Sequence, residues 1–252
     1  MLVEGVYFLS IKHMEKKVLL FSGGFDSTLQ EFLIKPDILL YVDMNTSYSK
    51  VEIEHLKTLP KYYTERLIIK ELPIGEYERK NKYLPYRNLI LGTIAMEYGQ
   101  HVYFGFNKAD DAPDKDTVFL QKISSLFRHL NINAIGDMGW DNYNFSFNAP
   151  FKKYTKTDLV RKCLSKGMNK EFISNIRTCY DSKSEKGCGL CGPCRRKAIA
   201  LINNGISIKG LFDTEPTLEL FEKTLQNLEE EGDGENVIGE YRQAIQILKK
   251  KG

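Results

Sequence analysis

The chain has 252 residues, of which 42% are hydrophobic and 27% are charged, a balance typical of a globular protein that buries its own core. With 36 basic and 33 acidic residues the formal net charge is only +3, so charge gives no support for a nucleic-acid partner. No run approaches the ~20 apolar residues of a membrane span, and Leu2–Ile11 lacks the basic start and cleavage site of a signal peptide, so we expect a cytoplasmic protein without membrane contact.

Short apolar runs alternate with helical patterns through the first 150 residues. Apolar runs of four to seven residues that end at glycine, proline or a charged residue are typical of buried parallel strands. The predicted strands are Lys17–Phe21, Asp37–Asp43, Arg66–Glu71, His101–Gly105 and Asn144–Ala149. The predicted helices between them are Ser27–Ile34, Ser49–Leu59, Tyr86–Tyr98 and Thr117–Leu130. This alternation predicts an α/β fold, a Rossmann-like parallel sheet with helices on both faces.

After Pro150 the pattern becomes helical. Helices are predicted at Thr155–Lys166, Lys170–Ile176 and Arg195–Asn203, around a Gly- and Cys-rich segment. The tail from Thr214 shows two amphipathic stretches, which predict a helical hairpin that packs on the body or forms a partner interface. We therefore expect a nucleotide-binding α/β domain at 1–150, a helical metal-binding region at 151–205 and a helical tail at 206–252.

The sequence Ser-Gly-Gly-Phe-Asp-Ser-Thr follows the first predicted strand and opens a helix. Gly23 and Gly24 permit positive φ and close approach of an anion to the backbone, and N–H groups at a helix start bind phosphate. Asp26 is expected to cap the helix, orient the loop or help hold Mg²⁺. The alternative is a plain strand-to-helix turn. We predict Ser22, Asp26 and Ser27 as catalytic, and an ATP site of Leu20, Phe21, Ser22, Gly23, Gly24, Phe25, Asp26, Ser27, Thr28 and, at the second strand end, Asp43.

This loop is neither a Walker A motif nor the dinucleotide fingerprint, because the Gly-Lys-Ser/Thr and the third glycine are both missing. Residues Ser22–Ser27 resemble the SGGxDS signature of the PP-loop ATP pyrophosphatases. The resemblance implies an adenine nucleotide alpha hydrolase-like fold and the splitting of ATP into an adenylylated substrate and pyrophosphate. Asp43 has an equally good interpretation as a turn residue at the end of its strand.

Four cysteines form the pattern C-x8-C-x2-C-x2-C at Cys179, Cys188, Cys191 and Cys194. Thiolates at this spacing converge on one ion, and four of them suit tetrahedral Zn²⁺ in a closed structural site. A [4Fe–4S] cluster is the main alternative, and four free thiols the simplest one; the absence of Cys-Pro after the last cysteine favours zinc. Cys163 lies outside the cluster and is expected to be a small buried residue.

Together the two motifs resemble the 7-cyano-7-deazaguanine synthase family, the nitrile-forming enzymes of queuosine precursor biosynthesis. The likeness runs over roughly residues 17–205. Its further segments are Tyr83–Asn88, Asn107–Asp114, Ala149–Phe151, Thr155–Asp158 and Thr178–Tyr180. The chain departs from the family pattern at Tyr86, where a glycine is usual, in Met44–Tyr48, in Ala112–Asp116, where an aromatic residue and an arginine are missing, and in the tail.

The resemblance implies that ATP and Mg²⁺ convert 7-carboxy-7-deazaguanine and ammonia into 7-cyano-7-deazaguanine through an acyl-adenylate and an amide, in a zinc-containing homodimer. The candidate substrate contacts that the resemblance implies are Arg87, Asn88, Asn107, Lys108, Asp110, Asp114 and Lys156. The basic side chains among these residues are candidates to neutralise phosphate or carboxylate, with solvated surface positions as the alternative.

Several other functions stay open on the sequence. The altered Ala112–Asp116 segment allows an enzyme that stops at the amide or transfers the activated deazaguanine to another amine, such as a protein terminus. A PP-loop tRNA-thiolating enzyme would need a nucleophilic cysteine at the loop, where Phe25 stands, and a zinc-knuckle binding module would have a decayed loop. The aromatic residues Trp140, Tyr143, Phe145 and Phe147 are interpreted as core or subunit interface because they alternate as in a strand.

Overall fold

The computed structural model describes residues 15–110, 112–138, 145–179, 181, 184, 186–232 and 234–250, with only the backbone given for 131–138. Leu2–Ile11, Trp140 and Tyr143 of the sequence interpretation lie outside the described residues, as do Asp111 and Tyr180 of the motifs. No helix of the described ranges combines the length and apolarity needed to cross a membrane.

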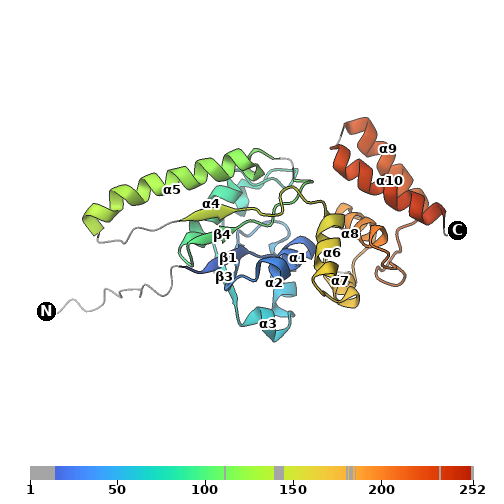
Figure 1. Ribbon diagram of the computed structural model, residues 1–252, viewed down its shortest axis with the longest axis horizontal. Helices are drawn as coiled ribbons and strands as arrows, with labels where there is room; N and C mark the ends of the chain where they lie inside the picture. The colour runs from blue at the N-terminus through green and yellow to red at the C-terminus, as the bar shows by residue number, and fades with distance from the viewer. Residues whose placement is uncertain are drawn as a thin grey trace.

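A five-stranded parallel sheet forms the centre of the body (Figure 1). Its strands are β1 (Lys17–Leu20), β2 (Ile38–Asp43), β3 (Leu67–Glu71), β4 (His101–Tyr103) and β5 (Ser146–Asn148), in the order β3-β2-β1-β4-β5. In register, Leu19 lies beside Leu39 of β2 and beside Tyr103 of β4. The predicted α/β fold is confirmed. The strand order reverses at β1, so the segment after β1 lies where open α/β sheets bind their ligands.

Helices cover both faces of the sheet. On one face Leu19, Leu39 and Tyr41 pack with Leu56 of α2 (Ser49–Lys57) and with Tyr63 of α3 (Lys61–Thr64). The opposite face packs against α4 (Arg87–Met96) and α5 (Thr117–Met138). The sequence pattern ended α5 at Leu130, which is wrong: the asparagines at 131 and 133 are weak helix formers, but neither breaks a helix as proline would. The described part of the body also contains the short 3₁₀ helices η2 (Gly75–Tyr77) and η3 (Pro113–Lys115).

The C-terminal helices join the body through a shared core. It links Phe25 and Leu29 of α1 (Phe25–Ile34) to the inner faces of the helices that follow β5. These helices are α6 (Lys156–Ser165), α7 (Lys170–Asn175), α8 (Gly192–Asn203), α9 (Leu218–Glu231) and α10 (Glu235–Lys249). Cys163 belongs to this core with none of its surface exposed, so its predicted burial is confirmed.

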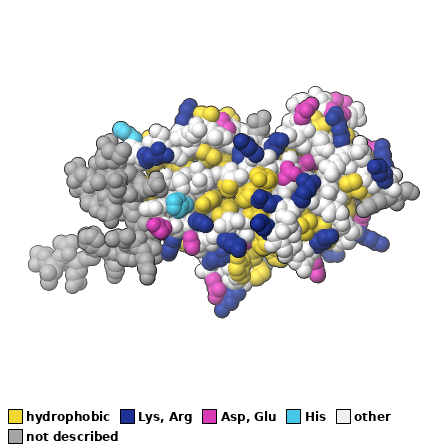
Figure 2. All heavy atoms as spheres, in the orientation of Figure 1, with side chains coloured by type: hydrophobic (Ala, Val, Ile, Leu, Met, Phe, Trp, Pro, Cys, Tyr) yellow, Lys and Arg dark blue, Asp and Glu magenta, His cyan; other side chains and the backbone are white. Residues whose placement is uncertain are grey.

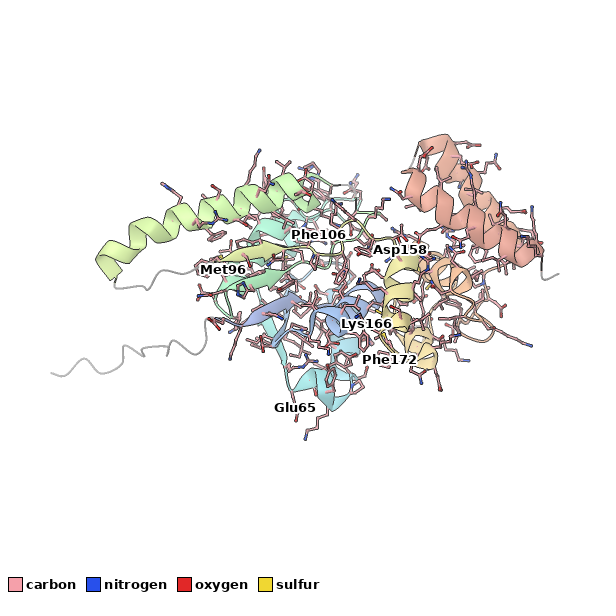
Figure 3. The ribbon with its side chains drawn as sticks, in the orientation of Figure 1. Glu65, Met96, Phe106, Asp158, Lys166 and Phe172 are labelled. Atoms are coloured by element: carbon pink, nitrogen blue, oxygen red, sulfur yellow. The ribbon has the colours of Figure 1, made fainter. Side chains whose placement is uncertain are left out.

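The tail forms the predicted hairpin, and of the two alternatives it packs on the body (Figure 1). Phe221 of α9 and Tyr241 of α10 are buried, with ring centroids 6.2 Å apart. Gly232 ends α9 in the left-handed conformation, with φ +69°, that helix C-terminal caps favour. Asp158 marks the start of α6, at the junction between the sheet and the C-terminal helices (Figure 3).

Candidate functional site

The loop between β1 and α1 holds a conformation suited to an anion. Gly23 has φ +70°, and a Cβ there would lie 3.0 Å from Leu56 and 3.1 Å from His55, so both the backbone and the space require glycine. Gly24 is extended, with φ −75° and ψ 175°, and acts as the N-cap. Gly23 therefore uses the positive φ that glycine permits, whereas Gly24 does not and instead starts the helix as a residue without a side chain.

Hydroxyl groups brace this loop from inside. Ser27 donates to the carbonyl of Gly24 at 3.1 Å, and Thr28 donates to the carbonyl of Gly23 at 3.2 Å. The hydroxyls of Ser22 and Ser27 lie 3.4 Å apart. The first N–H groups of an α-helix have no acceptor within the helix. The loop therefore presents backbone donors at the positive end of the α1 dipole, which is a ready site for phosphate.

Asp26 does not cap α1, because the helix begins at Phe25 after Gly24. It lies in the first turn, and its Oδ2 accepts from the ammonium of Lys156, the first residue of α6. The Lys156 side chain is only 10% exposed, so it belongs to the site and not to the solvated surface. The second oxygen of Asp26, Oδ1, is buried without a hydrogen-bond partner among the described residues. A free carboxylate oxygen beside a phosphate loop fits a Mg²⁺ ligand.

A cavity of about 310 Å³ opens directly over the loop and is called the loop cavity below. Its cations are Lys115, Lys156, Arg177 and Arg196, and its carboxylates are Asp26, Glu52 and Asp110. Lysine and arginine side chains facing a helix N-terminus form a site for a polyanion. The predicted residues that line this cavity are Ser22, Gly24, Phe25, Asp26, Ser27, Asn107, Asp110 and Lys156.

A second cavity of about 270 Å³ adjoins the first and is called the strand-end cavity. The two share Ser22, Asp26 and Ser27 in their walls. Its apolar lining residues are Leu20, Phe21, Leu40, Val42, Met44, Leu91 and Phe106, and polar and charged residues such as Glu52, Arg87 and Asn88 line it beside them. A cavity that combines apolar surface with convergent polar groups beside an anion site has the character of a pocket for a flat base.

Among the predicted contacts, Leu20, Phe21, Arg87 and Asn88 line the strand-end cavity. Arg87 donates to the hydroxyl of Tyr48 at 2.9 Å, and Asn88 donates to Asp114 at 2.9 Å. Asp114 thus holds Asn88 in place without lining either cavity.

Asp43 and Lys108 also lie outside the walls of both cavities. The Asp43 carboxylate accepts the N–H of Asn45 at 2.8 Å, an arrangement that matches its alternative interpretation as a strand-end turn residue. Lys108 is exposed and lines a different cavity, near the C-terminal hairpin.

Helix α2 supplies two site residues that the sequence interpretation missed. Nε2 of His55 lies 3.0 Å from the carbonyl of Gly23, to which it donates as the Nε2–H tautomer. Burial lowers the pKa of His55, and the nearby Arg177 lowers it further. Glu52 accepts the hydroxyl of Tyr41 at 2.9 Å, and burial raises the pKa of Glu52 to about 7. Glu52 and His55 lie three residues apart on the helix that follows β2, and this spacing is the sequence signal that could have identified them as site residues.

Lys115 restores a cation to the segment where the family pattern has an arginine and this chain does not. It lies in η3, lines both cavities, and forms an ion pair with Asp110 at 2.6 Å. The second oxygen of Asp110 accepts the N–H of Asn107 at 2.8 Å. The lysine and this backbone contact hold the pKa of Asp110 below its usual value although burial opposes them. The departure in Ala112–Asp116 therefore keeps a positive charge at the site.

The four clustered cysteines have the geometry of a metal site. Their sulfurs all lie within 4.8 Å of one another, and Sγ of Cys179 lies 4.0 Å from Sγ of Cys191. Tetrahedral Zn–S bonds of ~2.3 Å would place sulfurs roughly 3.8 Å apart. Backbone N–H groups also reach the sulfurs, from Cys188 to Cys179 at 3.4 Å and from Cys191 to Cys188 at 3.3 Å. The residues present fit one metal ion.

Glycines make this tight turn possible. Gly187 and Gly189 have φ of +121° and +75°, and a Cβ on Gly189 would lie 1.7 Å from the carbonyl oxygen of Thr214. Without a cation the sulfurs cannot all be charged: burial raises the pKa of Cys179, while a hydrogen bond from Cys194 lowers the pKa of Cys191 to about 5. A divalent ion would stabilise all four thiolates together.

The cysteine cluster also forms one wall of the loop cavity. Arg177, Thr178 and Cys179 line the cavity from one side of the cluster, and Pro193 and Arg196 line it from the other. Arg177 is tied to the cysteine loop by bonds to the carbonyls of Ser184 at 3.1 Å and Asp181 at 2.9 Å. The placement of two cavity cations therefore depends on the cysteine loop.

The parallel sheet, the SGGxDS loop at its switch point and the cysteine cluster define an α/β protein of the PP-loop type that can hold a metal ion. A family model described as "Queuosine biosynthesis protein QueC" matches residues 38–205, and the chain belongs to this family.

The names of curated relatives support this family assignment. The chain is 23% identical to the 7-cyano-7-deazaguanine synthase of Vesicomyosocius okutanii over 76% of this chain and 93% of the relative. A protein of the same name from Campylobacter hominis is 24% identical over 71% and 91%. Another, from Methanosphaerula palustris, is 30% identical over 52% of this chain and 57% of the relative.

Proposed function

We propose that this chain is an ATP-dependent carbon–nitrogen ligase that converts 7-carboxy-7-deazaguanine and ammonia into 7-cyano-7-deazaguanine. The observation that carries the proposal is the pairing of a phosphate loop with four cations around one cavity, in a chain of the QueC family. The name of the relatives supports the same product.

In this proposal the strand-end cavity takes an aromatic base and the loop cavity takes the phosphates. The apolar walls formed by residues such as Val42 and Leu91 exclude water from the faces of a base. The first-turn N–H groups of α1 and the side chains of Lys115 and Lys156 contact the triphosphate. Asp26 offers its unpartnered Oδ1 to Mg²⁺, which would neutralise phosphate charge there.

The first step replaces a poor leaving group by a good one. A carboxylate oxygen of the substrate attacks the α-phosphorus of ATP, the bond to the β-phosphate breaks, and pyrophosphate leaves. Arg177 and Arg196 line the loop cavity, so in this proposal their guanidinium groups stabilise the negative charge of the leaving pyrophosphate electrostatically. Ammonia then attacks the acyl carbon and AMP leaves, which gives the amide.

The second half repeats the activation on the amide. The amide oxygen attacks another ATP, pyrophosphate leaves, and loss of AMP with the nitrogen-bound protons gives the nitrile. Glu52 is placed to accept such a proton, because it lines both cavities and its pKa is raised to about 7 by burial. A carboxyl group with a pKa near the working pH is suited to proton transfer.

The cysteine cluster contributes structure in this proposal, with Zn²⁺ as the ion. Four thiolates saturate a tetrahedral zinc and leave no open position for substrate. Cys188, Cys191 and Cys194 would hold it together with Cys179. The consequence for activity is indirect, through Arg177 and Arg196 on either side of the cluster.

Mass spectrometry of the product tests this function. The chain is incubated with 7-carboxy-7-deazaguanine, ATP, Mg²⁺ and ammonium, and we expect the nitrile together with AMP and pyrophosphate. The Asp26→Asn variant is the matched control and is expected to form little product. An amide that accumulates without nitrile, or a conjugate with another amine, would reject the nitrile-forming step, and release of ADP would reject the adenylylation chemistry.

A further inference from the structure

A third cavity, of about 420 Å³, lies between the body and the C-terminal hairpin and is called the hairpin cavity. Thr224, Asn236 and Tyr241 line it from α9 and α10, and Lys108 and Lys152 line it from the body. The family match ends at residue 205, so the hairpin side of this cavity lies outside the matched region. The proposed reaction uses none of these five residues.

The hairpin cavity is strongly basic. Among the residues that the structure describes, its charged lining consists of Lys108, Lys152, Arg195 and Arg196 against one carboxylate, Asp110. None of the four cations forms an ion pair in the part of the chain that the structure describes. Figure 2 shows basic side chains, with acidic ones among them, on the face where the sheet body meets the hairpin. Like charges held together without counter-charges repel one another, and an anion relieves that cost.

Asp110, the only carboxylate that the described residues contribute to this lining, already has a partner at each oxygen. Oδ1 of Asp110 accepts from Lys115 at 2.6 Å and its Oδ2 accepts the N–H of Asn107 at 2.8 Å. Lys152 reaches only the backbone carbonyl of Asp110, which carries no net charge. The charge of Asp110 is therefore balanced from the loop-cavity side, and the positive charge of the hairpin cavity stays uncompensated among the described residues.

Two further features favour an anion. The Nε of Arg195 is buried without a hydrogen-bond partner among the described residues, and a buried donor left unpaired is costly. The first turn of α10, which spans 15 residues, also lines the cavity through Gly234, Asn236 and Val237, so the positive end of its dipole faces the same space.

We propose that the hairpin cavity binds a phosphate-bearing small molecule. Lys152 of the body and Arg195 of α8 would hold it, next to the start of α10. The volume of the cavity suits pyrophosphate or a nucleoside monophosphate. Asp110 and Arg196 line both this cavity and the loop cavity, so an anion here lies next to the site where the proposed reaction releases phosphate products. The inference concerns binding alone and does not require turnover.

Titration calorimetry with sodium pyrophosphate, without Mg²⁺ and at fixed ionic strength, tests this site. We expect the Lys152→Gln/Arg195→Gln double variant to bind at least about tenfold more weakly at one of two sites, and Lys115→Gln to weaken only the other. Lys209→Gln, an exposed lysine in the loop before the hairpin, is the matched control and should bind as the wild type does. Lys108→Gln, which removes an exposed side chain and leaves the buried core untouched, should reproduce part of the loss if the double variant fails to fold.

A second titration, with AMP, identifies the source of the phosphate. If the wild type binds pyrophosphate or AMP and the double variant does not, the result supports the site. A preference of the wild type for one of the two molecules shows whether the site takes free pyrophosphate or a nucleotide. Equal binding by the wild type and both hairpin-cavity variants would overturn the proposal, as would a loss confined to Lys115→Gln. Because no product is measured, failure here is distinguishable from failure of the proposed reaction.

Discussion

The phosphate loop and the cysteine loop are both glycine-rich turns at the start of a helix, yet the fold uses them differently. The phosphate loop opens onto a cavity and leaves an oxygen of Asp26 unpartnered. The cysteine loop turns its four sulfurs toward one another, and Cys179 and Cys194 are buried in the core shared with α6 and α8. One turn directs its polar groups outward to a ligand, and the other directs them inward to an ion that completes the fold.

The two loops should therefore respond differently to damage. Changes in the phosphate loop should reduce activity with small effects on stability, because the core behind it does not depend on a ligand. Changes in the cysteine loop should reduce both activity and stability, because that loop belongs to the core and also places Arg177 and Arg196 at the loop cavity. Three experiments test this distinction, and a fourth tests the protonation of Glu52, which lines the same cavity as the phosphate loop.

The largest effect is expected from loss of a metal ligand. Cys188→Ser should release the ion and lower the free energy of unfolding by on the order of 5 kcal/mol, because Cys179, Cys191 and Cys194 then lack a full ligand set. Thermal unfolding and elemental analysis, with about one zinc expected per wild-type chain, measure this. Cys163→Ala, a buried cysteine outside the cluster, should keep its metal. Iron with a brown chromophore would show that the ion is not zinc. A Cys188→Ser variant with unchanged metal content and unchanged stability would contradict the metal site itself.

Ser27→Ala is expected to have the next largest effect, and on activity alone. The variant loses the hydroxyl that braces Gly24 at 3.1 Å and that faces the cavity. We expect kcat/KM to fall by about 10²-fold and the free energy of unfolding to change by less than about 1.5 kcal/mol. Steady-state kinetics and thermal unfolding measure the two quantities, with Ser165→Ala, an exposed serine on α6, as control. A stability loss as large as that of Cys188→Ser would remove the distinction between the two loops.

The two glycines of the phosphate loop provide a finer test. Gly23→Ala forces a left-handed backbone on alanine and crowds Leu56, so we expect a loss of roughly 1–2 kcal/mol of stability. Gly24→Ala keeps an allowed extended conformation, and its Cβ would meet only Ser22 Oγ at 3.3 Å, so its stability loss should be smaller. Chemical denaturation of both variants measures the difference. Equal losses would show that φ at Gly23 is not the constraint.

The effect expected from Glu52→Gln depends on pH. The folded pKa of Glu52, about 7, lies above its ordinary value of 4.5, so the fold favours the protonated acid. Its stabilising contribution is present below pH 4.5 and is lost as pH rises through about 7. The amide that Glu52→Gln introduces does not titrate, so the variant should gain stability relative to the wild type between about pH 5 and pH 8. Melting temperatures across this range measure the gain.

His55, on the same helix as Glu52, provides a control for this measurement. His55 has a lowered pKa, so its contribution is lost as pH falls below about 6.5, the ordinary value. That change should appear equally in the wild type and in Glu52→Gln. A melting-temperature difference between the two proteins that does not vary with pH would contradict the assignment for Glu52.

The local parts of the fold and the site were predictable from the sequence because their signals are contiguous. The strand that precedes Ser22 and the C-x2-C-x2-C spacing each lie within a short window. Covalent proximity alone brings such residues together, whatever the rest of the chain does. The predicted clustering of the four cysteines is confirmed on this basis.

The site residues that the sequence interpretation missed, such as Arg177 and Arg196, could not be predicted because the fold assembles them from distant segments. Arg196 and Lys197 are neighbours in the sequence, but Arg196 faces two cavities while Lys197 is buried and donates to the carbonyls of Ser174 and Ile176 at 2.6 and 2.7 Å. Only the packing of α8 against its neighbours decides which face carries which charge. The strand order likewise depends on long-range pairing that no local pattern encodes.

The most direct test of the central claim follows oxygen atoms. With 7-carboxy-7-deazaguanine labelled with ¹⁸O in its carboxylate, transfer of an AMP group to the acid predicts that one labelled oxygen appears in AMP once ammonia has displaced it. Mass spectrometry of the nucleotide measures the label. Label in AMP would support activation at the loop that begins at Ser22, whereas label in inorganic phosphate, with ADP as the other product, would contradict it.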